Sequence, residues 1–333
     1  MTTLTTPQIN RHSRISGVGA YRPRHVVPNA EIVDLIDSSD EWIRTRSGIE
    51  TRGFAEADET VQMMSVSASQ QALKAANVLP EDVDCVIVAT VSHLMQTPAV
   101  AAMIADELGC TPAASFDISA ACAGFCHGVS LASDMVRTGT SSNVLVIGVE
   151  RLSDITDPRD RGTAFIFADG AGAVVVSESD IPAIGPTIWG SDGSRQKMIT
   201  MNNTWDTVFE DDEAQWPTLR MEGNAVFRWA SFEMAKVATK AIEAAGITPD
   251  QLDAFIPHQA NNRITDAMAR TLKLPATVAI ARDIVDQGNT SAASVPLAME
   301  RMLADGKAKS GDVALLIAFG AGLAYAAQVV VLP

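Results

Sequence analysis

An internal repeat limits the folds that this chain of 333 residues can adopt. Residues 72–88 read ALKAANVLPEDVDCVIV and residues 241–257 read AIEAAGITPDQLDAFIP, an offset of 169 positions. The same offset aligns the apolar runs at 144–149 and 313–318. Each copy keeps a helix end, a turn of proline and an acidic residue, and an apolar strand. Two separated matches at one offset, close to half the chain length, predict an ancient duplication.

Helical patterns alternate with short apolar strands in both copies, which is typical of layered α/β units with buried sheets. We therefore expect an α/β protein with one half at 15–180 and a second at 181–333. Residues 1–14 are polar and rich in threonine, and they lack the apolar segment of a signal peptide, so we expect a loose tail there.

The uncharged C-terminal stretch is nearly long enough to span a bilayer. The sequence Phe-Gly-Ala-Gly at 319–322 divides it, which favours two buried strands at 313–318 and 324–332 joined by a tight turn.

The charge balance excludes some classes of function. The chain carries 25 basic and 40 acidic residues, a formal charge of -15, which argues against a nucleic-acid-binding protein. The four cysteines form no Cys-x-x-Cys pair, so we expect reduced thiols in a cytoplasm and no metal. Cys122 and Cys126 share a helix face beside His127, but two such ligands do not make a metal site.

Cys122 is the candidate nucleophile. It lies among small residues between an apolar strand and a long helical pattern, where the positive end of the helix dipole favours the thiolate. Free cysteine is more often a buried apolar residue, so the alternative is a structural role. The repeat supplies partners: at the offset of 169, Cys122 aligns with Ser291, two residues after Asn289, and Ala89 aligns with His258. We expect Cys122, His258 and Asn289 to converge.

These three residue types suit acyl transfer from a thioester. Neutral imidazole and carboxamide groups donate to a developing enolate, whereas a carboxylate repels it. The set therefore favours carbon–carbon bond formation by decarboxylation of a malonyl thioester. Papain-like hydrolases use the same residue types, and the duplicated fold argues against that alternative. The turn at 319–322 is expected to add a backbone N–H to that of Cys122 in an oxyanion hole.

Four motifs together resemble those of β-ketoacyl-acyl-carrier-protein synthase III, a family of the thiolase superfamily. They are Ala-Cys-Ala-Gly-Phe at 121–125, Pro-His-Gln-Ala-Asn at 257–261, Gly-Asn-Thr-Ser-Ala-Ala-Ser at 288–294 and Phe-Gly-Ala-Gly at 319–322. The resemblance extends from Gly17–Pro23 to the final strand. It implies a thiolase-like fold of two α/β halves layered α-β-α-β-α, an acyltransferase and a homodimer.

The resemblance also implies roles for the site residues. Cys122 is acylated by an acyl-CoA primer, and His258 and Asn289 assist the decarboxylative Claisen condensation with malonyl-acyl carrier protein (malonyl-ACP), which initiates fatty acid synthesis. Acyl-CoA and malonyl-ACP are substrates, and no cofactor is implied. The family often has a third glycine where this chain has Ala321, whose backbone N–H is implied to take the same oxyanion role.

Further positions match the family's CoA and carrier-protein sites. An indole and a guanidinium suit the two faces of adenine. The expected CoA-binding residues are Trp42, Arg46, Arg161, Asn224, Phe227, Ala260 and Asn261. The carrier protein is acidic, and we expect it to dock on a local basic patch of Arg228, Arg263 and Arg270. Thr97 lies on a loop that resembles the one closing the partner subunit's acyl pocket. Members restricted to acetyl have phenylalanine there, so branched or longer primers are expected.

Several alternatives remain at this stage. A priming ketosynthase of an aromatic polyketide pathway has the same residues and chemistry, and a non-condensing acyltransferase of the superfamily is less favoured. A biosynthetic thiolase needs a second catalytic cysteine, but no cysteine follows Cys126. A non-catalytic partner subunit is expected to lack Cys122. Gly17-x-Gly19 and Gly170-x-Gly172 do not complete a dinucleotide-binding motif.

Overall fold

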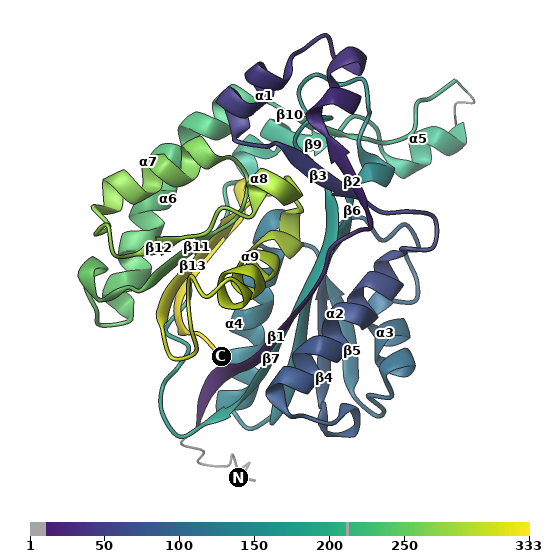
Figure 1. The fold of residues 1–333 in the computed structure, drawn as a ribbon. Helices are drawn as coiled ribbons and strands as arrows, with labels where there is room; N and C mark the ends of the chain where they lie inside the picture. Colours follow the sequence, from purple (N-terminus) through teal and green to yellow (C-terminus); the bar gives the residue numbers. More distant parts are fainter. Residues whose placement is uncertain (1–10, 211–212) are drawn as a thin grey trace.

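Two five-stranded sheets with the same strand topology form the computed structural model, which describes residues 11–210 and 213–333 (Figure 1). The first sheet has the order β1-β7-β6-β4-β5 and the second the order β8-β14-β13-β11-β12. In the first sheet the strands are β1 (His12–Tyr21), β7 (Asp169–Ser179), β6 (Asn143–Arg151), β4 (Cys85–Ala89) and β5 (Ala114–Ile118). In the second they are β8 (Ile188–Gly190), β14 (Tyr325–Val331), β13 (Val313–Phe319), β11 (Ala254–Pro257) and β12 (Ala279–Ile280).

Strand directions repeat as well as strand order. In each sheet the second strand is antiparallel to both of its neighbours, and the last three strands are parallel to one another. The expected duplication of two α/β halves is confirmed. The chain passes from the first sheet to the second between β7 and β8.

Helices complete five layers, α-β-α-β-α, as expected from the resemblance (Figure 1). The central layer holds α4 (Gly124–Arg137) and α9 (Ser294–Ala304), which pack between the two sheets. The outer layers hold α2 (Val61–Ala76) and α3 (Val100–Leu108) on the first sheet, and α6 (Gly223–Ala244) and α7 (Asn262–Leu272) on the second. Three apolar clusters fill the spaces between these layers. Because both faces of each sheet are covered, the central strands are apolar throughout.

The register of the two sheets corrects the sequence alignment by one residue. Cys85 pairs with Val144 in the first sheet, and Ala254 pairs with Ala314 in the second. The structural counterpart of Val144 is therefore Ala314 and not Val313. The offset grows from 169 to 170 between β11 and β13, because the second copy has one more residue there. In a strand, a shift of one residue moves a side chain to the opposite face.

The ends of the chain differ slightly from expectation. Strand β1 begins at His12, which pairs with Ser179, so residues 12–14 are not part of a loose tail. The rest of that expected tail, 1–10, lies outside the described residues. Strands β13 and β14 confirm the two C-terminal strands within a residue and are joined by a 3-10 turn, Ala321–Leu323. In the described part of the chain, no helix has the length and apolarity needed to cross a membrane.

Smaller elements gather at one end of the sheets, at the top of Figure 1. They are α1 (Asp40–Ser47), β2 (His25–Pro28), β3 (Thr51–Phe54), β9 (Ile199–Met201), β10 (Leu219–Met221), α5 (Trp205–Glu210) and α8 (Ile284–Gln287). Arg52 on β3 is fully buried and donates hydrogen bonds to the carbonyls of Val27 and Phe165 and to the side chain of Asn29. It thereby joins this region to the segment 163–168, which lines the site described next.

Candidate active site

Cys122 lies at the centre of a 3-10 turn, Ala121–Ala123, between β5 and the buried helix α4. A matching turn, Ser291–Ala293, precedes α9, and the two turns lie against each other. Both begin with a residue in the left-handed region, Ala121 at φ 46° and Ser291 at φ 48°. The structural counterpart of Cys122 is therefore Ala292 and not Ser291, which is the same one-residue correction seen in the sheets.

The glycine turn after β13 packs directly on the nucleophile. A Cβ added to Gly320 would lie 2.7 Å from the backbone nitrogen of Cys122 and 3.0 Å from its Cβ, so only glycine fits at this position. The next residue, Ala321, lines the same cavity as Cys122. The backbone N–H groups of Cys122 and Ala321, which are predicted to form the oxyanion hole, thus belong to two chain segments that are in contact.

Burial decides the protonation state of Cys122. The pKa of the Cys122 thiol is raised to about 12, chiefly by loss of solvent and also by the nearby Glu150 carboxylate. The Ser291 hydroxyl and the backbone at the helix start lower this pKa but do not compensate. The backbone at the helix start thus favours the thiolate, as expected, but burial outweighs it and the resting thiol is neutral at pH 7.

His258 follows β11 and is only 3% exposed. Its backbone N–H donates to the carbonyl of Ile317 over 2.7 Å, and its Nδ1 is 2.6 Å from Oγ of Ser294 at the start of α9. The ring packs edge-on against Phe319, the residue before Gly320, with centroids 5.5 Å apart. Burial lowers the pKa of His258 to about 3, so the imidazole is neutral at physiological pH.

Asn289 is fixed by both its backbone and its side chain. Its N–H donates to the carbonyl of Ile166, and its own carbonyl accepts from the N–H of Ala168. The side-chain oxygen accepts from the N–H of Ser291 over 2.8 Å. Because the oxygen is engaged, the amide nitrogen is the group left to donate to a substrate.

Two neighbouring cavities reach Cys122 and Asn289, whereas His258 lines neither of them. The inner one, about 210 Å³, has a mostly apolar wall that includes Cys122, Ser291 and Ala321. The outer one, about 450 Å³, reaches Asn289. Both are lined by residues from the same three segments, 165–167, 219–221 and 289–291. The outer cavity therefore adjoins the inner cavity that holds the thiol.

All the residues expected to bind CoA line the outer cavity. They are Trp42, Arg46, Arg161, Asn224, Phe227, Ala260 and Asn261. The guanidinium carbon of Arg161 is 5.2 Å from the centre of the Trp42 ring, and that of Arg46 is 5.6 Å from it. Arg161 thus stacks on the indole itself, so an adenine between the two requires Arg161 to move aside.

The expected docking arginines are not all at this cavity. Arg263 lines it and stacks on Phe227 at 4.7 Å. Arg270, seven positions later on α7, is exposed on the same side of that helix. Arg228 lines a separate cleft of about 740 Å³. Thr97 is exposed and does not line the inner cavity of its own chain.

Two further groups beside the thiol were missed by sequence reasoning. Glu150, at the carboxyl end of β6, is fully buried and hydrogen-bonded to Ser291, which in turn lies beside Cys122. An acidic residue directly after the apolar run 144–149 was the available signal, because such positions lie at the edge of a parallel sheet where ligands bind. Among the described residues, no group of three or more His, Cys, Asp or Glu side chains is placed to hold a metal ion.

Comparison with known proteins decides the family. Residues 116–193 match the family model described as 3-oxoacyl-[acyl-carrier-protein] synthase III, and residues 242–332 match the model of its C-terminal part. The β-ketoacyl-[acyl-carrier-protein] synthase III of Streptomyces glaucescens is 60% identical, with 97% of both chains covered. The chain belongs to the β-ketoacyl-acyl-carrier-protein synthase III family. The mycobacterial enzyme of Mycobacterium marinum is 53% identical over 95% of this chain and 94% of its own.

Solved structures agree with this family. The priming β-ketosynthase of the R1128 polyketide pathway has a TM-score of 0.98 at 48% identity, covering 100% of this chain and 99% of its own. The synthase III of Aquifex aeolicus has a TM-score of 0.88 at 37% identity, covering 96% and 99%. The thiolase fold and the assignment as a condensing acyltransferase are confirmed.

Proposed function

We propose that this synthase III condenses an acyl-CoA primer with malonyl-ACP, with loss of CO2, and so initiates fatty acid synthesis. The observation that carries the proposal is the position of Cys122. Its thiol lines an apolar cavity of about 210 Å³ that adjoins a second cavity lined by every expected CoA-binding residue. A thioester held in the outer cavity can thus present its acyl group to the sulfur.

In the first half-reaction, the Cys122 sulfur attacks the thioester carbonyl of the primer. The developing oxyanion is proposed to accept hydrogen bonds from the backbone N–H groups of Cys122 and Ala321. When the intermediate collapses, the bond from the carbonyl carbon to the CoA sulfur breaks. CoA leaves with a proton, and the primer remains as a thioester on Cys122.

In the second half-reaction, malonyl-ACP loses CO2, and the electron pair of the broken bond forms an enolate. Neutral His258 and the Asn289 amide are proposed to donate hydrogen bonds to the enolate oxygen. The enolate carbon then attacks the acyl group on Cys122, and the cysteine sulfur leaves. Because decarboxylation supplies the carbanion, this chemistry requires no metal or redox cofactor.

The size of the inner cavity bears on primer choice. One water molecule in the liquid occupies about 30 Å³, which is close to the volume of one methylene group. The inner cavity, at about 210 Å³, is several times larger. We therefore propose primers that are branched or longer than acetyl. Thr97 is proposed to close the inner cavity of the partner subunit, where its small side chain leaves room.

The direct test is intact mass spectrometry after incubation with acetyl-, isobutyryl- and longer acyl-CoAs, followed by malonyl-ACP. One acyl adduct per chain that malonyl-ACP discharges supports the proposal. Absence of an adduct with every primer would refute it. An adduct that transfers to another acceptor without release of CO2 would indicate a non-condensing acyltransferase instead.

A second candidate is supported by one specific observation, the TM-score of 0.98 to a priming β-ketosynthase of a polyketide pathway. The site chemistry is the same in both cases, and only the carrier protein differs. Turnover with the malonyl-loaded carrier proteins of the two pathways distinguishes them. A preference for the fatty acid carrier protein supports the first candidate, and the opposite preference supports the second.

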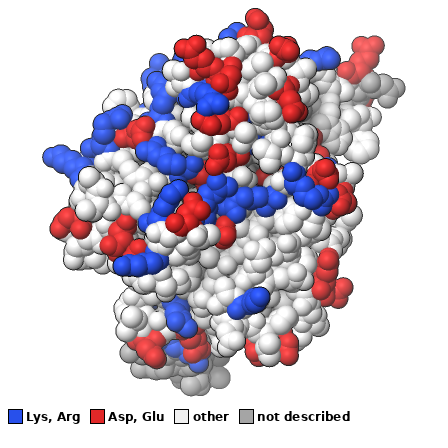
Figure 2. Space-filling view, in the orientation of Figure 1, with Lys and Arg blue, Asp and Glu red and all other residues white. Residues whose placement is uncertain are grey.

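We propose that the carrier protein docks on α7 near the outer cavity. The chain is acidic overall, yet Figure 2 shows basic side chains gathered along the helix labelled α7 in Figure 1. Arg263 and Arg270 belong to this helix and are exposed. Salt screens charges beyond about 8 Å, so these local charges and not the net charge govern docking.

Arg263→Glu is expected to raise the KM for malonyl-ACP at least tenfold while changing acylation by acyl-CoA only a few-fold, since it reverses a charge at the docking surface. Steady-state kinetics with each substrate varied in turn measures the two effects. Lys236→Glu, an exposed change elsewhere on the second half, is the control. Equal losses for both substrates would contradict a docking role.

We also propose that two copies associate through the edge strand β5. This strand is last in its sheet, so one side of its backbone is unpaired there. Phe116 on β5 is 37% exposed, and Leu94 and Met95 on the adjoining loop are 47% and 51% exposed. A second copy would cover these apolar groups and bring Thr97 to the neighbouring site.

Phe116→Arg is therefore expected to shift the protein from dimer to monomer and to lower condensation, because each site loses the partner's loop. Sedimentation velocity measures the mass in solution. Phe232→Arg, at an exposed aromatic residue of α6, is the control. A Phe116→Arg protein that sediments as the wild type would contradict this interface.

A further inference from the structure

Glu150 is a fully buried carboxyl group that the proposed reaction does not use. Its Oε2 accepts hydrogen bonds from Oγ of Ser92 over 2.6 Å, from the N–H of Val91 over 3.1 Å and from Oγ1 of Thr90 over 3.3 Å. All three donors belong to the loop that follows β4. One carboxylate oxygen is thus fully occupied, and the group cannot turn away from the site.

The other oxygen, Oε1, points toward the nucleophile. It accepts a hydrogen bond from Oγ of Ser291 over 3.1 Å. Ser291 lines the inner cavity together with Cys122, and a side-chain hydrogen bond joins it to the sulfur. A hydroxyl that donates to Glu150 keeps lone pairs free to accept from the thiol.

We propose that Glu150 is a positioning residue that takes the Cys122 proton through Ser291 and keeps it while the cysteine is acylated. This inference rests on the proposed function and extends it. His258 is less suited to the same task, because its Nδ1 is engaged with Ser294 and its burial disfavours the charged imidazolium.

The proton balance closes over one turnover. As the sulfur attacks the primer, its proton moves to Oγ of Ser291 and the serine proton moves to Oε1 of Glu150. The departing CoA thiolate takes a proton from solvent. When the enolate later displaces the cysteine sulfur, Glu150 returns its proton through Ser291. Glu150 is therefore neutral during decarboxylation, so no carboxylate opposes the enolate.

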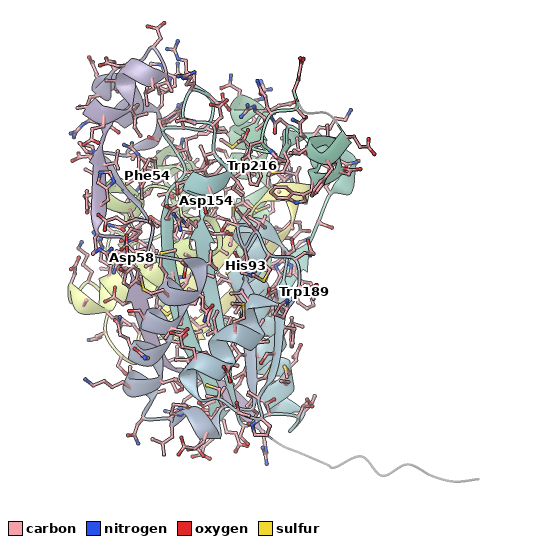
Figure 3. All side chains as sticks on the ribbon, turned by 90° about the vertical axis from the view of Figure 1, so that its right-hand side faces the viewer. Phe54, Asp58, His93, Asp154, Trp189 and Trp216 are labelled. Carbon is pink, nitrogen blue, oxygen red and sulfur yellow. The ribbon has the colours of Figure 1, made fainter. Side chains whose placement is uncertain are left out.

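Cys122 is a titratable group that feels the charge of Glu150, and two other charged or titratable groups come directly after Glu150 or its partner Ser92 in the chain. The next residue, Arg151, pairs with Asp154 over 3.3 Å. His93, on the same loop as Ser92, has a buried Nε2 without a hydrogen-bond partner in the described structure, and Figure 3 shows it on the same face as Asp154. On that face Nε1 of Trp216 also donates to the carbonyl of Asp154 over 3.0 Å.

The sign of the pH effect follows from burial, which raises the pKa of Glu150 to about 7. Only ionised Glu150 can accept the proton, so reaction of Cys122 is expected to accelerate as the pH rises through about 7. The expected profile in the wild type climbs below this value and flattens above it. Without the relay, the rate is expected to keep rising toward the thiol pKa of about 12.

Two variants interrupt the relay at different points. Glu150→Gln removes the acceptor. Ser291→Ala keeps Glu150 and its loop contacts but removes the bridge, and alanine tolerates this backbone because Ala121 adopts φ 46° at the equivalent position. Asp169→Asn is the control. Asp169 is also fully buried, with a pKa raised to about 6, but it binds Ser153 and the N–H of Ala55 instead of the cysteine turn.

The measurement is the pH dependence of Cys122 alkylation by iodoacetamide and of CoA release in the acylation burst. Both relay variants are expected to lose the break near pH 7 and to react about 100-fold more slowly at that pH, a usual loss for a removed base. Infrared difference spectra on acylation are expected to show a new carboxylic-acid band in the wild type and in Asp169→Asn, and not in Glu150→Gln.

An unchanged pH profile in both relay variants, or no carboxylic-acid band in the wild type, would overturn the inference. Either result leaves the proposed function intact if the acyl adduct still forms and malonyl-ACP still discharges it. Absence of the adduct in the wild type would instead refute the proposed function itself.

Discussion

Cys122→Ser is expected to lower condensation by at least three orders of magnitude and to abolish the stable acyl adduct. The serine hydroxyl is far less acidic and less nucleophilic than the thiol, and the residues around it are arranged for a larger sulfur atom. The substitution changes one atom at a partly exposed position, so the fold should remain. Intact mass after addition of acyl-CoA, together with the rate of CoA release, measures the loss.

Cys126→Ala is the matched control for this prediction. Cys126 lies on the same helix, four positions later, but is fully buried in the central apolar cluster. Burial raises the pKa of the Cys126 thiol to about 12, as it does for Cys122. What separates them is access to the inner cavity, which Cys122 alone of the two lines. An acyl adduct that persists in Cys122→Ser and disappears in Cys126→Ala would contradict the assignment.

The strand topology could be predicted from the sequence, because both copies of the duplication keep the same local sequence patterns. The helix end, the proline–acidic turn and the apolar strand recur in both copies, and the structure places them in equivalent strands of two sheets. The exact register was not accessible. The apolar runs at 144–149 and 313–318 look alike at either offset, and only the pairing of Ala254 with Ala314 reveals the extra residue.

The electrostatics of the nucleophile were harder to predict than its position. The helix start can be expected from the sequence around Cys122, and its backbone hydrogen bond does lower the pKa of the thiol. The effect of this bond is smaller than that of desolvation, which depends on how closely the turn after β13 and the turn Ser291–Ala293 approach the sulfur. Burial of this kind arises from residues about 170 to 200 positions away, and local patterns do not report it.

The role of Glu150 was also hard to predict, because it depends on a contact with a residue that is distant in the sequence. In sequence it is one of 40 acidic residues, and its place directly after an apolar run is the local signal that marks it. Its role depends on Ser291, which lies 141 positions away. By contrast, every residue expected to bind CoA was found at the outer cavity. Those positions were taken from motifs of the family, which encode the tertiary arrangement that single residues do not.

His258→Ala is expected to leave acylation of Cys122 nearly intact while lowering decarboxylation and product formation by two to three orders of magnitude. The imidazole is neutral because burial lowers its pKa to about 3, and its proposed role is to donate a hydrogen bond to the enolate oxygen. Loss of one such donor in a water-excluded site has an effect of this size. Burst release of CoA reports acylation, and release of CO2 from malonyl-ACP reports the second step.

Ser294→Ala is an informative companion variant, because it removes the partner of Nδ1 and keeps the imidazole. It is expected to lower the second step less than His258→Ala does. Since His258 becomes protonated only below about pH 3, neither variant should alter the rise in acylation rate near pH 7. If His258→Ala removed that rise, the imidazole and not Glu150 would be the base for Cys122. The two half-reactions would then share one residue, whereas the proposed scheme gives the first to Glu150 and the second to His258.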